Sequence, residues 1–207
     1  KALKKMSSVN NEIIDKKKFP VVLGGEHSIT PGCIAPFTRR YKKLYLLHFD
    51  AHADLRESYN GEKFSHASAI RRCLDYPNIS VISFGIRNIS KSEVSFLNKN
   101  SSRINVFWAK DKIKWNLNKF KKMIKNKTVY LTFDVDGLDS SIMPATGTPE
   151  PGGLLWDETL NIIKIAAKNS QIVGVDINEL SPIKGFNSYN FLVAKLAYKI
   201  LSYKFIF

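Results

Sequence analysis

The sequence has few features that belong to a specialised class of protein. It contains only two cysteines, Cys33 and Cys73, which lie far apart and match no metal-binding or redox spacing. We therefore expect free thiols in a reducing cytoplasm, at least one of them buried as a small apolar side chain. No apolar run approaches the length of a membrane span and no signal peptide is visible, so we expect no membrane partner.

An initiator methionine, internal repeats and low-complexity linkers are also absent. The chain begins at Lys1, and its first recognisable element, residues 18–23, is typical of an interior strand. We expect that upstream sequence is missing or was removed, with a processed start as the alternative. At 207 residues and 44% hydrophobic, the chain can bury one substantial core. We therefore predict a single domain, residues 1–207, that lacks its N-terminal part.

Acidic residues are scarce beside basic ones, with 18 Asp and Glu against 32 Lys and Arg and a net charge of +14. Such a balance can indicate nucleic acid or an anionic membrane as partner. The excess is scattered lysine, as in residues 16–18 and 110–127, and no nucleic-acid motif accompanies it. We therefore favour a solvated, lysine-rich surface and expect no nucleic-acid partner.

Short β-branched or aromatic segments alternate with longer amphipathic ones. Near-continuous hydrophobicity predicts strands covered on both faces, at residues 19–23, 44–49, 79–84, 104–108, 129–133 and 172–175. A capping box of Ser90 and Glu93 predicts a helix through Asn98. Further helices are predicted from apolar stripes over residues 113–124, 156–167 and 193–200. This alternation predicts an α/β fold, a three-layer α/β/α sandwich with a mainly parallel sheet.

Polar clusters follow four of the predicted strands. They are residues 24–27, 50–54, 134–136 and 176–179. Ligands of open parallel sheets bind at the carboxyl ends of the strands, so one crevice can collect all four clusters. The long irregular stretch at residues 139–153 is rich in Pro, Gly and Thr, and loops of this length usually carry function.

Two of these clusters carry carboxylates at alternate positions. Asp50, His52 and Asp54 are each two residues apart. In an extended backbone such side chains point to one face, so the spacing directs all three into one pocket. Asp134 and Asp136 repeat the spacing after a second strand.

His27 adds an imidazole from a third strand end. Taken singly, an Asp at a strand end is a cap or turn residue, and a lone His is a hydrogen-bonding group. Four carboxylates packed together would repel one another and protonate, which a pair of divalent cations prevents. An oxygen-rich set with two imidazoles and no thiolate suits manganese better than zinc. Two such cations about 3.5–4 Å apart can share a bridging carboxylate and a bridging water, whose pKa falls until hydroxide is available near neutrality.

Six motifs occur in order along nearly the whole chain. They are Gly-Gly-Glu-His-Ser (24–28), Phe-Asp-Ala-His-Ala-Asp-Leu-Arg (49–56), Ser-His-Ala (65–67), Phe-Asp-Val-Asp-Gly-Leu-Asp (133–139), Ala-Thr-Gly-Thr-Pro-Glu-Pro-Gly-Gly (145–153) and Asp-Ile-Asn-Glu-Leu-Ser-Pro (176–182). Together they resemble the arginase/agmatinase (ureohydrolase) family, and agmatinases more than arginases. The resemblance implies an arginase-like fold and a homo-oligomer, either a trimer or a hexamer.

The resemblance also implies two manganese ions per subunit, bridged by two shared carboxylates. One ion would be held by His27, Asp50, Asp54 and Asp134. The other would be held by Asp50, His52, Asp134 and Asp136, with Asp50 and Asp134 as the bridges.

Three residues take catalytic roles by the same resemblance. Asp54 would hydrogen-bond the bridging hydroxide and pass its proton to the departing amine. Glu179 would grip the guanidinium group of the substrate, and His66 would shuttle protons. Taken alone, Glu179 is a surface loop residue and His66 the first residue of a helix. His48 receives no role, and Asp176 is left as a supporting or structural residue.

The implied reaction is the hydrolysis of agmatine to putrescine and urea, in which hydroxide attacks the guanidinium carbon and a C–N bond breaks. One alternative is another ureohydrolase: an arginase, a guanidinobutyrase or a formimidoylglutamase. A second is a truncated, non-catalytic relative that modulates an oligomer. The complete set of candidate ligands argues against the second alternative, because a chain freed from catalysis has no physical need to hold four carboxylates together.

Overall fold

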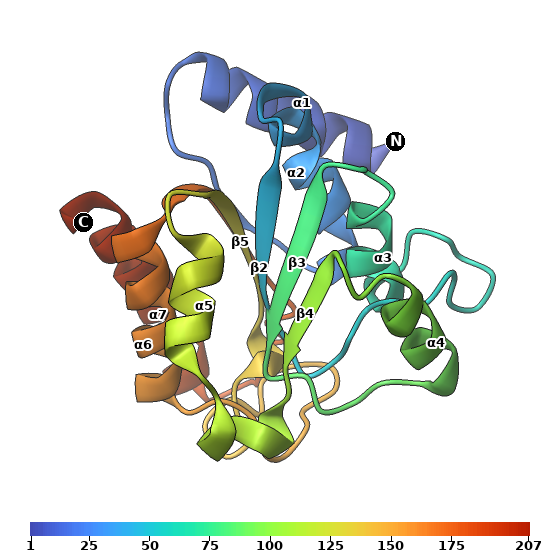
Figure 1. Ribbon diagram of the computed structural model, residues 1–207. Helices are drawn as coiled ribbons and strands as arrows, with labels where there is room; N and C mark the ends of the chain where they lie inside the picture. The colour runs from blue at the N-terminus through green and yellow to red at the C-terminus, as the bar shows by residue number, and fades with distance from the viewer.

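The computed structural model describes residues 1–207 and contains one six-stranded sheet (Figure 1). The strands are β1 (Val21–Leu23), β2 (Leu44–Phe49), β3 (Ile79–Phe84), β4 (Ile104–Phe107), β5 (Thr128–Asp134) and β6 (Gln171–Asn178). Their order across the sheet is β1-β6-β5-β2-β3-β4, and every neighbouring pair is parallel. All strands therefore point their carboxyl ends to the same edge.

Helices cover both faces of this sheet. They are α1 (Ala2–Asp15), α2 (Thr30–Arg40), α3 (Ala69–Cys73), α4 (Lys91–Lys99), α5 (Leu117–Ile124), α6 (Trp156–Asn169) and α7 (Asn187–Ile206). Figure 1 shows α1 to α4 on one side of the strands and α5, α6 and α7 on the other. The predicted three-layer α/β/α sandwich is confirmed. No helix is both long enough and apolar enough to cross a membrane.

Each face of the sheet has its own hydrophobic core. On the side of α5, α6 and α7, Phe49 stacks between Phe84 and Phe133, with ring centroids 5.9 and 4.9 Å away. On the other side, α2 and α3 pack against the sheet and contribute Cys33 and Cys73, which are both buried and unpaired. These two cores hold the central strands rigidly, so the residues that follow the strands start from fixed positions.

The predicted helix over residues 113–124 is wrong at its N-terminal end. Ile113 lies in a separate 3₁₀ segment, Ala109–Lys114, and its side chain is fully exposed. The chain leaves the helical path at Trp115, and α5 begins after Asn116, whose side chain accepts a hydrogen bond from the backbone N–H of Lys119. This cap starts a new helix and rotates the earlier residues away from the core.

Candidate metal centre

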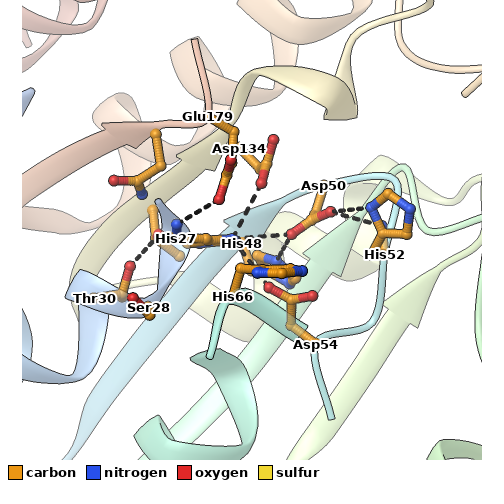
Figure 2. A network of polar contacts seen from close by, with 12 residues as sticks. His27, Ser28, Thr30, His48, Asp50, His52, Asp54, His66, Asp134 and Glu179 are labelled. Atoms are coloured by element: carbon orange, nitrogen blue, oxygen red, sulfur yellow. Dashed lines mark hydrogen bonds and ion pairs between the residues drawn. The ribbon is translucent and has the colours of Figure 1, made fainter. Parts of the chain in front are cut away.

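Four neighbouring strands deliver the candidate residues to the carboxyl edge of the sheet. β1 leads into the loop 24–28 and its His27, β2 is followed by Asp50, and β5 ends in Asp134. β6, between β1 and β5, is followed by Glu179. Because these four strands are consecutive in the sheet, residues far apart in the sequence meet at one place (Figure 2).

His27 lies at the centre of the first donor group. Its Nδ1 is 3.1 Å from Asp50 Oδ2, 3.1 Å from Asp54 Oδ2 and 3.4 Å from Asp134 Oδ2. The ring is completely buried, and Nδ1 has no partner with hydrogen-bond geometry. Three carboxylate oxygens therefore converge on one ring nitrogen from which water is excluded.

The other ring nitrogen shows which tautomer His27 adopts. Nε2 lies 2.8 Å from Thr132 Oγ1, and the Thr132 hydroxyl donates to Asp176 Oδ1 at 2.6 Å. Because the single hydroxyl proton goes to the carboxylate, Thr132 must accept from the Nε2–H of His27. In the neutral ring Nδ1 is then a bare lone pair. A lone pair facing three carboxylates is repelled by them unless a positive charge lies between. In the metal-free protein that charge is a proton, because burial lowers the pKa of His27 but hydrogen bonds to the three carboxylates outweigh it and hold the pKa well above its usual value. A bound cation would take the place of this proton.

A second donor group surrounds His52. Its Nδ1 is 3.0 Å from Asp136 Oδ2 and 3.5 Å from Asp50 Oδ1. Asp50 thus turns one oxygen to each imidazole, Oδ2 to His27 and Oδ1 to His52. The structure therefore gathers all six candidate ligands into two adjacent groups that share Asp50.

The charges in the two groups shift each other's pKa values strongly. Burial and the charge of Asp50 raise the pKa of Asp54 to about 7. Burial and the charges of Asp136 and Asp50 raise the pKa of Asp134 well above its usual value. Burial lowers the pKa of His52, but hydrogen bonds to Asp136 and Asp50 outweigh it and raise the value to about 11. These carboxylates need added positive charge to be ionised together, and a pair of divalent cations fits the donor set.

His48 also approaches Asp50, and its position gives it a supporting part. Its Nε2 lies 2.8 Å from Asp50 Oδ2 and its Nδ1 lies 3.0 Å from Ser83 Oγ. His27, His48 and Asp50 together could hold an ion by distance alone. Both nitrogens of His48 already have protein partners, however, so we assign it the orientation of Asp50.

Two candidate residues adopt backbone conformations that the sequence did not reveal. Asp54 has a φ of 53° and Glu179 a φ of 65°, in the left-handed region that L residues avoid by about 1–2 kcal/mol. The N–H of Glu179 donates to Gly25 O at 2.7 Å, and its Oε1 accepts the N–H of His27 at 2.7 Å. Strain of this kind is concentrated at functional sites.

A cavity of about 430 Å³ opens over the two donor groups. The candidate residues that line it are His52, Asp54, His66, Asp134, Asp136 and Glu179. His27 and Asp50 lie fully buried behind this lining. His66 begins a short 3₁₀ turn, His66–Ser68, and its Nδ1 lies 2.8 Å from Glu26 Oε1.

Sequence reasoning missed the residue that holds the loop 138–154 over the site. Arg87 follows β3 and carries no motif that marks it. Its guanidinium donates to the backbone carbonyl oxygens of Gly85, Asp136, Leu138, Glu150 and Pro151. From the loop so held, Thr148 donates to Asp136 Oδ2 at 3.3 Å. Arg87 therefore ties the loop to the segment that carries Asp136.

Known proteins that are similar to this chain include ureohydrolases and agmatinases. An N(1)-aminopropylagmatine ureohydrolase from Synechocystis sp. is 37% identical over 194 residues, covering 92% of this chain and 62% of that protein. An agmatinase from Bacillus anthracis is 38% identical over 176 residues, covering 84% of this chain and 59% of that protein. The crystal structure of the agmatine ureohydrolase of Thermoplasma volcanium superposes with a TM-score of 0.85 at 33% identity, covering 98% of this chain and 68% of that one.

The chain thus spans about three fifths of the length of the curated relatives it matches. A family model described as the arginase family matches residues 1–202. By this match, and by relatives above 30% identity over most of its length, the chain belongs to the arginase family.

Proposed function

We propose that the protein hydrolyses the guanidinium group of agmatine, giving putrescine and urea, with the help of two manganese ions. The observation that carries this proposal is the convergence of three carboxylate oxygens on the buried Nδ1 of His27, at 3.1 to 3.4 Å. The second donor group, around His52, lies directly beside it and shares Asp50. Relatives named agmatinase and N(1)-aminopropylagmatine ureohydrolase support a guanidinium substrate of this type.

The six candidate ligands divide between the two ions in this proposal. His27, Asp50, Asp54 and Asp134 hold one, and Asp50, His52, Asp134 and Asp136 hold the other. A shared role for Asp134 is supported by its two contacts: Oδ2 lies 3.4 Å from His27 Nδ1, and Oδ1 accepts the backbone N–H of Asp136 at 2.9 Å. When bound, two cations neutralise the carboxylates and lower the pKa of a water molecule, so that hydroxide is available near neutral pH. Manganese is favoured over zinc because most donors are oxygens.

Glu179 is the proposed binding residue for the guanidinium group. Its carboxylate lines the cavity, and the backbone N–H of His27 fixes Oε1 at 2.7 Å. Oε2 is left to accept an N–H of the substrate in a charge-assisted hydrogen bond. The same contact aligns the guanidinium carbon over the donor groups, which favours attack by holding the reactants together.

Asp54 and His66 are the proposed proton carriers. Asp54 lies 3.1 Å from His27 Nδ1 and lines the cavity, where it can take a proton from the attacking water and give it to the departing amine. His66 lines the same cavity and its side chain is half exposed, so it can exchange protons between solvent and the amine. No other histidine of the chain combines this exposure with a place at the cavity.

The decisive experiment measures bound metal and product release on the same sample. We expect about two manganese ions per chain and urea release from agmatine that exceeds release from N(1)-aminopropylagmatine, arginine and guanidinobutyrate. Preference for another guanidinium compound, or formamide release from formimidoylglutamate, would keep the reaction type and change the substrate. A sample that binds two ions and cleaves none of these compounds would be a non-catalytic relative, and the proposal would be wrong.

The assembly and location of the protein are proposed on the family resemblance alone. We propose a homo-oligomer, a trimer or a hexamer, in the cytoplasm. Sedimentation analysis of the metal-loaded protein tests the first part, and fractionation of the source cells tests the second. A monomer at micromolar concentration would contradict the first.

A further inference from the structure

We propose that Glu26 is a positioning residue that fixes the orientation and the tautomer of His66. The inference depends on the proposed function, in which His66 carries a proton. It adds a residue from the loop 24–28 to the site, although Glu26 neither lines the cavity nor belongs to either donor group.

Both oxygens of Glu26 are engaged, and one is directed at His66. Oε1 lies 2.8 Å from the ring Nδ1 of His66 and 3.4 Å from its backbone N. Oε2 accepts the hydroxyl proton of Ser28 at 2.6 Å. The carboxylate is therefore held by a neighbour in its own loop while it binds the ring and the backbone of a residue 40 positions later.

This contact determines which ring nitrogen of His66 carries the proton. An ionised carboxylate only accepts hydrogen bonds, so Nδ1 must be the donor and Nε2 is the unprotonated nitrogen of the neutral ring. Nε2 has no protein partner, and the ring belongs to the wall of the cavity together with Asp54 and Glu179. The edge of Tyr59, 5.4 Å away between ring centroids, limits rotation of the imidazole. The nitrogen that can exchange a proton with a ligand is thus the one the protein leaves unoccupied.

The loop 24–28 therefore contacts or carries three parts of the site. It carries His27, its backbone N–H at position 27 holds Glu179, and its Glu26 holds His66. The metal-ligand candidate His27, the substrate-binding carboxylate of Glu179 and the proton carrier His66 are therefore all held by the same short loop. A single displacement of this loop would disturb all three, which is why the test below separates the effect of Glu26 from a displaced loop.

A double-mutant cycle makes that separation. We expect Glu26→Ala to lower kcat about tenfold or more, because a misoriented base loses part of its contribution to proton transfer, while KM and bound metal stay unchanged. Glu26→Gln should retain more of kcat, since its amide oxygen can still accept from Nδ1–H. In a His66→Ala background, Glu26→Ala should have no further effect on kcat. Glu62→Gln, an exposed carboxylate of the neighbouring turn with no hydrogen bond or ion pair from its side chain, is the matched control.

An equal loss of kcat from Glu26→Ala in both backgrounds, or a loss of bound metal, would overturn the proposal in favour of a displaced loop. A second measurement does not need activity. Long-range ¹H–¹⁵N spectra of the protein loaded with diamagnetic Zn²⁺ should show His66 protonated at Nδ1, and Glu26→Ala should move the proton to Nε2. An unchanged tautomer contradicts the proposal. If the wild type cleaves no guanidinium compound, the proposed function fails, and the spectra still decide the role of Glu26.

Discussion

The tautomer of His27 is set by the Thr132 hydroxyl group, which lies between the imidazole and the carboxylate of Asp176. Thr132 transmits the negative charge of Asp176 to the ring, because it donates to the carboxylate and accepts from Nε2–H. Thr30 and Asn178 also donate to Asp176 Oδ1, at 3.0 and 2.5 Å. Asp176 therefore supports the site without facing it.

Thr132→Val tests this relay. Valine has nearly the same shape but no hydroxyl, so the Nε2–H of His27 loses its acceptor and the ring loses its preference for a bare Nδ1. We expect the affinity for Mn²⁺ to fall about 10- to 100-fold, measured by equilibrium dialysis or calorimetry. Thr128→Val, at the partly exposed start of the same strand, should leave the affinity unchanged. Equal affinities in the two variants would contradict the relay.

His52→Ala removes the only imidazole of the second donor group. We expect urea release to be abolished and bound manganese to fall by about half or more, because the second ion loses its only nitrogen donor and keeps three carboxylates, Asp50, Asp134 and Asp136, two of which it shares with the first ion. Elemental analysis of the purified protein gives the metal content. Full activity in this variant would refute the assignment of the site.

Glu179→Gln should separate substrate binding from metal binding. The amide keeps the shape of the side chain but loses the charge that attracts the guanidinium, so we expect kcat/KM to fall about 100-fold or more. Metal content should stay near the wild-type value, because Glu179 is no ligand in the proposal. Loss of both ions would show that its role has been misplaced, and Glu62→Gln again serves as the control.

The sequence predicted the location of the site from the ends of the strands, but not the backbone conformation of the segments that follow them. The carboxyl ends of parallel strands bring His27, Asp50 and Asp134 together, as predicted. Asp54 joins them, but not because alternate residues share a face, since β2 ends at Phe49 and Asp54 has a φ of 53°. Their roles as ligands remain a prediction. Thr132 and Arg87 carried no signal, and Glu26 only marked its motif without indicating a role, since each of the three matters through a partner that the fold brings from elsewhere in the chain.

At the scale of elements, the two ends of the loop 138–154 are hydrogen-bonded to each other. The backbone N–H of Asp139 donates to Leu154 O at 2.8 Å, and Asp139 Oδ2 accepts the N–H of Gly153 at 2.8 Å. Arg87 binds carbonyl oxygens near both ends of the same loop. The loop is therefore a fixed wall of the cavity.

Arg87→Lys should loosen this wall. A lysine ammonium keeps the charge, but it cannot present the planar set of donors that reaches five carbonyl oxygens. We expect faster hydrogen exchange at Gly153 and Leu154 and a loss of roughly 1–3 kcal/mol in the free energy of unfolding. Arg39→Lys, at an exposed arginine of α2 without side-chain hydrogen bonds, is the control. Unchanged exchange in the loop would show that Arg87 does not clamp it.

Elements with a clear hydrophobic run were predicted well, whereas the helices α1, α2 and α3 were not predicted. The predicted bounds of β2 and β3 agree with the structure. The helix α2 was missed because it contains Pro31, Gly32 and Pro36, which disfavour a helix locally. Burial against α1 outweighs that preference, since a Cβ on Gly32 would lie 2.8 Å from Leu3 O. Local propensity cannot reveal a contact of this kind.

At the scale of the whole molecule, the metal-free protein should lose stability as the pH rises. The pKa of Asp54 is raised to about 7, so its ionisation from about pH 4 to about pH 7 is harder in the folded state and favours unfolding. The pKa of His52 is raised to about 11, so its stabilising proton is lost as the pH rises from about 6.5 upwards. Asp50, whose pKa is lowered well below its usual value, is ionised in both states over this range.

We therefore expect the Tm of the metal-free protein to fall steadily from about pH 5 to about pH 9, as measured by calorimetry. Adding Mn²⁺ should raise the Tm most at the alkaline end, because ionised carboxylates bind the cation more strongly. A Tm that rises with pH, or that ignores Mn²⁺, would show that the carboxylates are not gathered as described.

The fold class followed from the alternation of strands and helices, but the strand order did not. Nothing in residues 19–23 indicates that β1 pairs with β6, with Val21 opposite Val175. Strand order depends on how helices and strands pack together in three dimensions, and the periodicity of the sequence gives no information on that packing.

The pairing of β1 with β6 also sets the order in which the centre can be completed during synthesis. Asp50, His52 and Asp136 can meet once residue 136 has left the ribosome, whereas the strand that anchors the loop of His27 is finished only at Asn178. A nascent chain can therefore form the half around His52 before β6 is complete, whereas the half around His27 depends on β6 for its support. A product that stops short of β6 would keep most of the ligands and still lack the support that gives His27 its place.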